Sequence, residues 1–198
     1  MVNLKRTRED ILFAVEALIH HQGFQSTGLK ELFAASGMSS GSFYNYFGSK
    51  DELAHALIDF KWNQIKTSVL EPAQAASDDP IAQVFWMIDQ LEAKHLAEPD
   101  CGGCFLGNLI VEVAKQDAAF QRHLMQVFDE WQATIARSLR AGQQQLKLEI
   151  DADSLAEQLL VMIEGALLLG RLYSEPQRLS RHFDAVRQLL RSALKVSC

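Results

Sequence analysis

The spacing of apolar residues constrains the fold of this chain more than any other feature. Apolar side chains recur every three or four positions almost throughout, which is the period of an amphipathic helix. The repeats cover residues 11–19, 53–60, 81–91, 105–113, 120–135, 155–169 and 183–194. A short stretch, "QLKLEID" at 145–151, is the one candidate for a strand. We therefore predict an all-α protein of about nine helices.

Composition narrows the class of protein. A length of 198 residues is enough for one large domain or two small ones. Hydrophobic residues make up 48% of the sequence, which is enough to bury a core. The sequence has no run of 18 apolar residues, and its start, "MVNLKRTRED", lacks the apolar segment of a secretion signal. Its three cysteines, an odd number, argue against a secreted disulfide framework. We expect a cytoplasmic protein without membrane spans.

Capping residues mark several helix boundaries. Ser49 and Glu52 have the spacing of a capping box that opens a helix. Pro80 follows Asp79, as expected for a proline at the first position of a helix. Asp151 can cap the long apolar helix predicted around residues 155–169. The stretches "EPAQAASDDP" (71–80) and "SEP" (174–176) are predicted links between helices.

The segment 23–50 has the pattern of a helix-turn-helix unit. Thr27 is predicted to cap a first short helix, and Gly37 to end it, because a tight turn needs a residue that tolerates positive φ. Ser39 then caps a second helix over residues 40–46. This helix would expose small polar residues, which suit a DNA groove: Ser40, Gly41, Ser42 and Asn45.

Four aromatic residues, in and directly after this second helix, divide into two roles. Phe43 and Phe47 are predicted to anchor it in the core of the unit. Tyr44 and Tyr46 carry a hydroxyl at the end of a flat ring, so they can reach phosphates. The overall net charge of −6 argues against nucleic-acid binding, but residues 1–50 hold five basic and four acidic residues, so the acidity lies elsewhere.

The stretch "STGLKELFAASGMSSGSFYNYFGSKDEL" resembles the DNA-binding segment of the TetR family of transcriptional repressors. The resemblance implies a DNA-binding domain over residues 1–50, an effector-binding and dimerisation domain over 51–198, and a homodimer on a palindromic operator. Positions that commonly meet DNA in the family are occupied by Thr27, Lys30, Ser39, Ser40, Ser42, Tyr44, Asn45, Tyr46 and Lys50.

Two positions depart from the family pattern. Ser40 stands where many members carry Lys or Arg, and Tyr46 stands where others carry His. The second helix therefore has little positive charge, and phosphate binding would depend on Lys5, Arg6, Arg8, Lys30 and Lys50. We predict a modest dependence of DNA affinity on salt.

The motif "CGGC" at 101–104 allows several interpretations. Cys104 falls near the start of a helix, where the helix dipole lowers the pKa of a thiol and favours a reactive thiolate. Alternatives are a bridge between Cys101 and Cys104, zinc binding with His95 and His123, and a small buried residue. The stretch "GGCFLGNLIVEV" resembles a TetR subgroup that includes an electrophile-responsive repressor, which implies a sensor role for Cys104.

A pocket for a small-molecule effector is the usual device of the family. Asn108 and Glu112 share a helix face, where each needs a partner: the other residue or a ligand. Candidates for the effector or sensor site are Cys101, Cys104, Trp86, Phe105, Asn108, Glu112, Phe128, Trp131, Met162 and Glu164.

The last two helices, around 155–169 and 179–194, are too apolar to be exposed, so we expect them to pair with a second chain in a four-helix interface. Such a dimer places two recognition helices about 34–36 Å apart. The sequence thus predicts a repressor released by an effector or by modification of Cys104, with no cofactor and no enzymatic activity. The alternative is an all-α ligand-binding or carrier protein that does not bind DNA; a thiol enzyme using Cys101 and Cys104 has no supporting acid or base motif.

Overall fold

The computed structural model describes residues 6–98 and 101–195, and helices dominate both ranges. The α-helices are α1 (Arg8–Gln22), α2 (Leu29–Ser36), α3 (Ser40–Tyr44), α4 (Lys50–Ile65), α5 (Glu71–Ala76), α6 (Pro80–Leu96), α7 (Phe105–Val113), α8 (Ala118–Ala141), α9 (Ala152–Tyr173) and α10 (Pro176–Ala193). A π-helical segment, η1 (Lys66–Leu70), joins α4 to α5, and a 3₁₀ turn, η2 (Gln143–Gln145), follows α8.

The predicted all-α fold is confirmed. Because α4, η1 and α5 follow one another without a break, the described residues contain nine continuous α-helical segments. The candidate for a strand at 145–151 does not form one. The described residues there make a single antiparallel bridge between Leu146 and Leu194, and no helix in the described ranges is long and apolar enough to cross a membrane.

The link predicted at residues 71–80 is mostly helical, because α5 occupies its first six residues. Pro72 explains how. A proline inside a helix lacks the N–H for the bond to residue i−4, and its ring clashes with that carbonyl. Here the preceding turn widens into the π-helical segment, in which the Glu71 N–H bonds the Lys66 carbonyl. The chain therefore leaves the helix only at Ser77.

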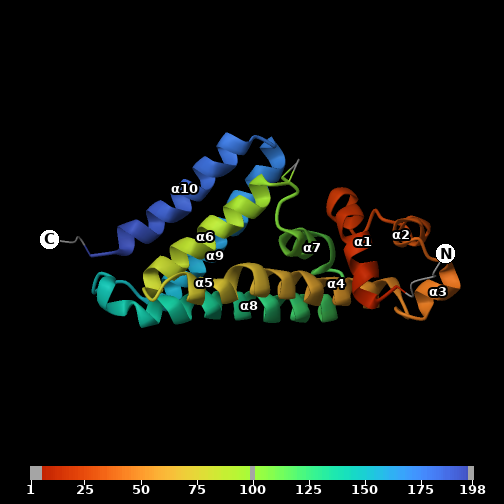
Figure 1. The fold of residues 1–198 in the computed structure, drawn as a ribbon, viewed down its shortest axis with the longest axis horizontal. Helices are drawn as coiled ribbons and strands as arrows, with labels where there is room; N and C mark the ends of the chain where they lie inside the picture. The colour runs from red at the N-terminus through yellow and green to blue at the C-terminus, as the bar shows by residue number, and fades with distance from the viewer. Residues whose placement is uncertain (1–5, 99–100, 196–198) are drawn as a thin grey trace.

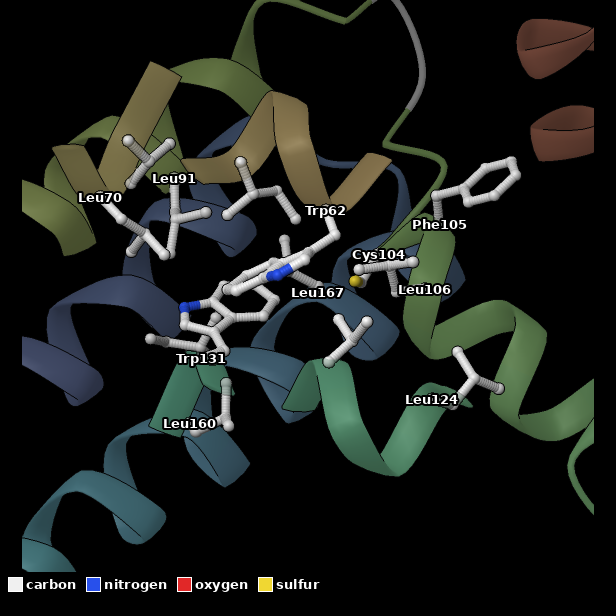
Figure 2. Packing of buried hydrophobic residues seen from close by; sticks show 14 of the residues in the cluster. Trp62, Leu70, Leu91, Cys104, Phe105, Leu106, Leu124, Trp131, Leu160 and Leu167 are labelled. Atoms are coloured by element: carbon white, nitrogen blue, oxygen red, sulfur yellow. The ribbon is translucent and has the colours of Figure 1, made fainter. Parts of the chain in front are cut away.

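The helices form two unequal groups (Figure 1). Helices α1, α2 and α3 cluster at one end of an elongated molecule, while α8 and the α4–α5 helix run along its length. Helices α6, α9 and α10 pack together at the other end. The core of the larger group surrounds Trp62 and Trp131, whose ring centroids lie 5.8 Å apart (Figure 2).

Most predicted helix starts are confirmed by their caps. The carboxylates of Asp79 and Asp151 accept backbone N–H bonds at the starts of α6 and α9. Ser49 caps α4 by accepting the Glu52 N–H. The second half of the expected capping box differs, since the Glu52 carboxylate accepts the N–H of Gly48 rather than that of Ser49.

Candidate DNA-binding surface and effector site

The predicted helix-turn-helix is present in α2 and α3. Gly37 ends α2 with φ of 62°, a left-handed conformation that glycine adopts without strain. The N–H of Met38 then bonds the Phe33 carbonyl at 3.0 Å, which closes the turn. Ser39 caps α3 by accepting the Ser42 N–H at 3.3 Å. Helix α3 ends at Tyr44, two residues before the predicted position, and Asn45 is its C-cap.

Two phenylalanines fix α3 to the rest of the domain. Phe43 and Phe47 are both fully buried, as predicted from the sequence. The Phe43 ring packs against Phe33 with a centroid separation of 5.1 Å and against Phe47 at 5.5 Å. This aromatic cluster holds one side of α3 against α2, so the opposite side faces outward.

The outward side of α3 carries small polar groups and one tyrosine. Ser40, Ser42 and Asn45 are exposed, and Tyr44 is 44% exposed with its ring edge against Phe33. A Cβ added at Gly41 would meet no atom within 4 Å, so the helix surface is open there. The Ser39 hydroxyl donates to the Ser42 hydroxyl at 3.0 Å. We call this set of exposed residues, 40–42, 44 and 45, the α3 surface.

Thr27 does not lie on this surface. Its side chain is fully buried, and its hydroxyl donates to the Gly23 carbonyl at 2.7 Å. The predicted capping role is also wrong, because Gly28 is the N-cap of α2 and its N–H bonds the Glu31 carboxylate at 2.7 Å. Thr27 therefore stabilises the loop before α2 from inside the domain.

Tyr46 and Lys50 are engaged within the protein. The Tyr46 hydroxyl donates to the Arg6 carbonyl at 2.6 Å, which ties the start of the chain to the end of α3. The Lys50 ammonium donates to the Phe24 carbonyl at 2.6 Å and lies 4.4 Å from the centroid of the Phe24 ring. Burial lowers the pKa of Lys50. Both side chains therefore bond to backbone groups within the domain instead of projecting from its surface.

The other basic residues predicted to hold phosphate are also mostly paired. Arg6 donates to the Ser36 carbonyl, and Arg8 lies 3.5 Å from the Glu52 carboxylate. Lys30 is exposed on α2 and forms no ion pair with another described residue. Lys5 lies outside the described residues. Of these side chains only Arg8 is balanced by a carboxylate, since Arg6 bonds a neutral carbonyl and keeps its charge.

Cys104 occupies the N-cap of α7, as its position before the apolar run predicted. Its Sγ accepts the Gly107 N–H at 3.3 Å. The residue is only 7% exposed, and Figure 2 shows the sulfur among Trp62, Leu106 and Leu167. Burial, and secondarily the Glu164 carboxyl, raise the pKa of the thiol well above its usual range.

The expected low pKa of Cys104 is thus wrong, because burial outweighs the bond at the helix start. Cys101 is half-buried, and burial raises the pKa of its thiol too. Both are free thiols, so the Cys101–Cys104 bridge considered from the sequence is not formed. The described residues contain no group of three His, Cys, Asp or Glu side chains placed to hold a metal.

Two hollows meet at Cys104. The inner cavity, of about 30 Å³, lies under the Cys104 loop, and its walls include the predicted residues Cys104, Phe105 and Trp131. The outer groove, of about 210 Å³, runs between α7 and α9. Its lining comprises Cys104, Gly107, Asn108, Ile110, Val111, Glu164, Gly165 and Leu168. The inner cavity holds little more than a water molecule, so the groove is the roomier site.

Other predicted pocket residues do not line either hollow. Trp86, Phe128 and Met162 are half-buried and pack against the hydrophobic core.

Asn108 and Glu112 do not pair with each other. Asn108 donates to the Gly102 carbonyl at 3.0 Å, and the Glu112 carboxylate accepts the Gln25 N–H at 2.9 Å.

Three ionisable residues at the inner cavity were missed by the sequence analysis. Lys61, Lys94 and His20 line it, and burial followed by the nearby Lys61 lowers the pKa of Lys94. Lys61 forms an ion pair with Glu16 of α1. A signal for Lys61 did exist, because it falls at an apolar position of α4, among buried residues of the same stripe. The sequence contains no such signal for His20, because the carbonyl that its ring contacts at 2.9 Å belongs to Gly103, which is distant in the chain.

Comparisons with known proteins agree with this arrangement. The family model "Bacterial regulatory proteins, tetR family" matches residues 11–57, and "Tetracyclin repressor-like, C-terminal domain" matches residues 81–186. An uncharacterised HTH-type transcriptional regulator in the lacX 3′ region of Lactococcus lactis subsp. lactis is 31% identical over 186 residues, which cover 93% of each chain.

Two further proteins share the fold. A TetR family regulator from Cytophaga hutchinsonii superposes with a TM-score of 0.83 at 21% identity, covering 97% of this chain and 96% of that one. The HTH-type transcriptional repressor NemR of Escherichia coli strain K12 is 27% identical over 107 residues, 54% of each chain. Its reduced form gives a TM-score of 0.78 at 22% identity over 93% of this chain and 97% of that one. With two family models matching in order and a relative aligned over nearly its full length, this chain belongs to the TetR family of DNA-binding transcriptional repressors, which are regulators and not enzymes.

Proposed function

We propose that this chain acts as a homodimer that represses transcription by placing the α3 surface of each subunit in a major groove of a palindromic operator. The observation that carries this proposal is the division of α3 into a buried aromatic side and an exposed small polar side. A repressor acts where the DNA is, so we also propose a cytoplasmic location. The functional division is a DNA-binding part at residues 1–50 and an effector and dimerisation part at 51–198.

The proposed DNA contacts come from the α3 surface and its edges. Ser40 and Ser42 offer hydroxyls to phosphates, and Asn45 offers an amide that can pair with a base edge. Tyr44 reaches past them because its ring stands at the rim of the aromatic cluster. Ser39 and Lys30 are proposed phosphate contacts. The paired side chains of Tyr46 and Lys50 are proposed to order the domain, and Thr27 is left out because it is buried.

The proposed dimer interface is an apolar stripe on α9. Val161, Leu168 and Leu172 are 65%, 60% and 69% exposed, although each is a large apolar residue on one helix. A contiguous exposed patch of this kind is unusual on a monomer and is expected to be covered by another chain. Helix α10 lies against α9, so two copies of the pair would form the four-helix interface expected from the sequence.

The effector is proposed to act from the hollows at Cys104, which are linked directly to the DNA-binding domain. The Gly103 carbonyl beside Cys104 bonds His20 of α1, and Glu112 at the far end of α7 bonds the backbone of Gln25. A ligand that displaces α7 would therefore pull on the loop after α1. The buried thiol of Cys104 favours release by a bound ligand over release by direct modification.

An electrophoretic mobility shift with DNA from upstream of the chain's own gene tests this proposal. We expect Tyr44→Ala and Asn45→Ala each to weaken binding at least about tenfold, as the loss of a good base or phosphate contact does. The matched control is Asn63→Ala, an exposed asparagine on α4 outside the α3 surface, which should bind as the wild type does. Absence of binding to any fragment, with a folded protein, would favour the carrier-protein alternative.

A further inference from the structure

Glu164 is a buried carboxyl group in the outer groove, and the proposed function leaves its binding partner unassigned. It lies on α9 and lines the outer groove, where its carboxyl group faces Gly107 of α7 and neighbours the Cys104 thiol. Its Oε1 atom is buried and has no hydrogen-bond partner among the described residues. Buried carboxyl oxygens are normally paired, and each exception calls for an explanation.

The groove around this carboxyl group has the shape of a built site. Gly107 of α7 leaves room for the carboxyl group, because even the Cβ of an alanine there would collide with Glu164 Oε2. Gly165 leaves the neighbouring position on α9 open, since a Cβ there would meet no atom within 4 Å. Ile110 and Val111 of α7 supply exposed apolar walls around the opening, and Leu168, which the proposed dimer would cover, bounds the groove on the α9 side. The groove of about 210 Å³ is thus apolar except for Asn108 and the Glu164–Cys104 pair.

The electrostatics of the groove specify what is missing. Glu164 forms no ion pair with any described basic residue. Asn108 already donates its amide N–H to Gly102. A carboxylate buried without a cation is costly, and the strongest complement to it is a charged N–H donor. No donor among the described residues satisfies Oε1, and a charged N–H donor from outside would be its strongest complement.

We propose that the outer groove binds a small organic cation, a primary amine with a short apolar arm. Its ammonium group donates to the Glu164 carboxylate, and its apolar arm lies against Ile110 and Val111 of α7. This inference rests on the proposed function in one respect: the amine would be the class of effector that acts at α7. The site itself is a property of this chain and can be tested without DNA.

The protonation of Glu164 gives the proposal a distinctive pH dependence. Burial raises the pKa of Glu164 to about 7, and the Cys104 hydrogen bond opposes this only partly. Cys104, on α7, is the titratable neighbour among the described residues, and its raised pKa keeps it neutral through this range. An alkylammonium keeps its positive charge over this pH range, as lysine does, so it binds the ionised form of Glu164. Below about pH 7 Glu164 is mostly protonated, and binding then has to displace the proton from its carboxyl group. The affinity should therefore increase roughly tenfold between pH 6 and pH 8.

Isothermal titration calorimetry of the purified full chain with n-hexylamine hydrochloride tests the site. We expect saturable binding that tightens from pH 6 to pH 8, whereas sodium hexanoate and 1-hexanol bind at least about tenfold more weakly at pH 8. In Glu164→Gln the pH dependence should disappear and the affinity for hexylamine should fall about tenfold or more. The matched control is Glu157→Gln, an exposed glutamate two turns earlier on α9, which should leave both unchanged.

Specific results would overturn the proposal. Equal binding of hexylamine and 1-hexanol would show that the groove recognises only the apolar arm. Unchanged binding in Glu164→Gln would place the amine elsewhere. If hexylamine does not bind and Glu164→Gln weakens the dimer in sedimentation, a donor from the second subunit fills the site instead. The mobility shift is measured separately, so amine binding by a chain that does not bind DNA would refute the proposed function and leave this site intact.

Discussion

The ion pair between Lys61 and Glu16 gives the sharpest stability prediction. Lys61 is only 9% exposed, and the Glu16 side chain is 17% exposed, so the pair joins α4 to α1 in a largely dry contact. Replacing Lys61 with Met removes the cation but leaves the carboxylate. Breaking a buried pair in this way typically costs 3–5 kcal/mol, and the partial exposure of Glu16 places the expected loss near the lower end, about 3 kcal/mol.

Urea denaturation followed by far-UV circular dichroism measures this loss. At a fixed protomer concentration, about 3 kcal/mol corresponds to a Tm lowered by roughly 6–12 °C for a chain of this size. The double variant Glu16→Met, Lys61→Met removes both charges together, so its stability should return to within about 1 kcal/mol of the wild type. The reasoning is refuted if Lys61→Met changes the free energy of unfolding by less than about 0.5 kcal/mol, or if the double variant is as unstable as the single one.

Further predictions concern the two chemical groups at the groove and the dimer. The pKa of Glu164 is about 7 in the folded chain against its usual 4.5, so the folded state binds that proton more tightly than the unfolded state does. The free energy of unfolding should therefore fall by up to about 3 kcal/mol as the pH rises from 4.5 to 7. Denaturation measured at each pH should show a flatter dependence for Glu164→Gln. Because the pKa of Cys104 is raised, iodoacetamide should modify it more slowly than free cysteine at pH 7.5 and faster as the pH rises, as followed by peptide mass spectrometry; modification as fast as that of free cysteine would contradict the burial argument. Leu168→Lys and Leu172→Lys should each shift sedimentation toward the monomer, whereas Leu148→Lys, at a residue 94% exposed outside α9, should not.

Local signals explain why the helix-turn-helix could be predicted from the sequence. Gly37, Ser39 and the pair Phe43 and Phe47 act within one or two turns of their own positions, and each was placed correctly. Pro72 shows the limit of such signals. Proline and small residues predicted a link, but packing of the long helix overrode them, and the backbone absorbed the proline by widening one turn.

The roles of side chains at the candidate sites depended on contacts that the sequence does not show. Lys50 was predicted to contact DNA and Glu112 to pair with Asn108 or a ligand, yet each bonds a backbone group of the loop after α1. For Cys104 the helix start was predicted correctly and its acidity was not. The dipole at the start of α7 is local, whereas burial among Trp62 and Leu167 comes from α4 and α9, distant in the chain (Figure 2).

The unbroken course of α4, η1 and α5 gives the molecule a mechanical property. From Lys50 to Ala76 the helix is about 40 Å long at 1.5 Å per residue, with one end against the loop at Phe24 and the other in the core of the larger group (Figure 1). Over that length a tilt of about 5° displaces the far end by roughly 3 Å, comparable to the rise of one base pair. The helix is thus a lever arm with its widened turn partway along. In the proposed dimer, an adjustment of this size near the turn would change the spacing of the two α3 surfaces relative to the DNA.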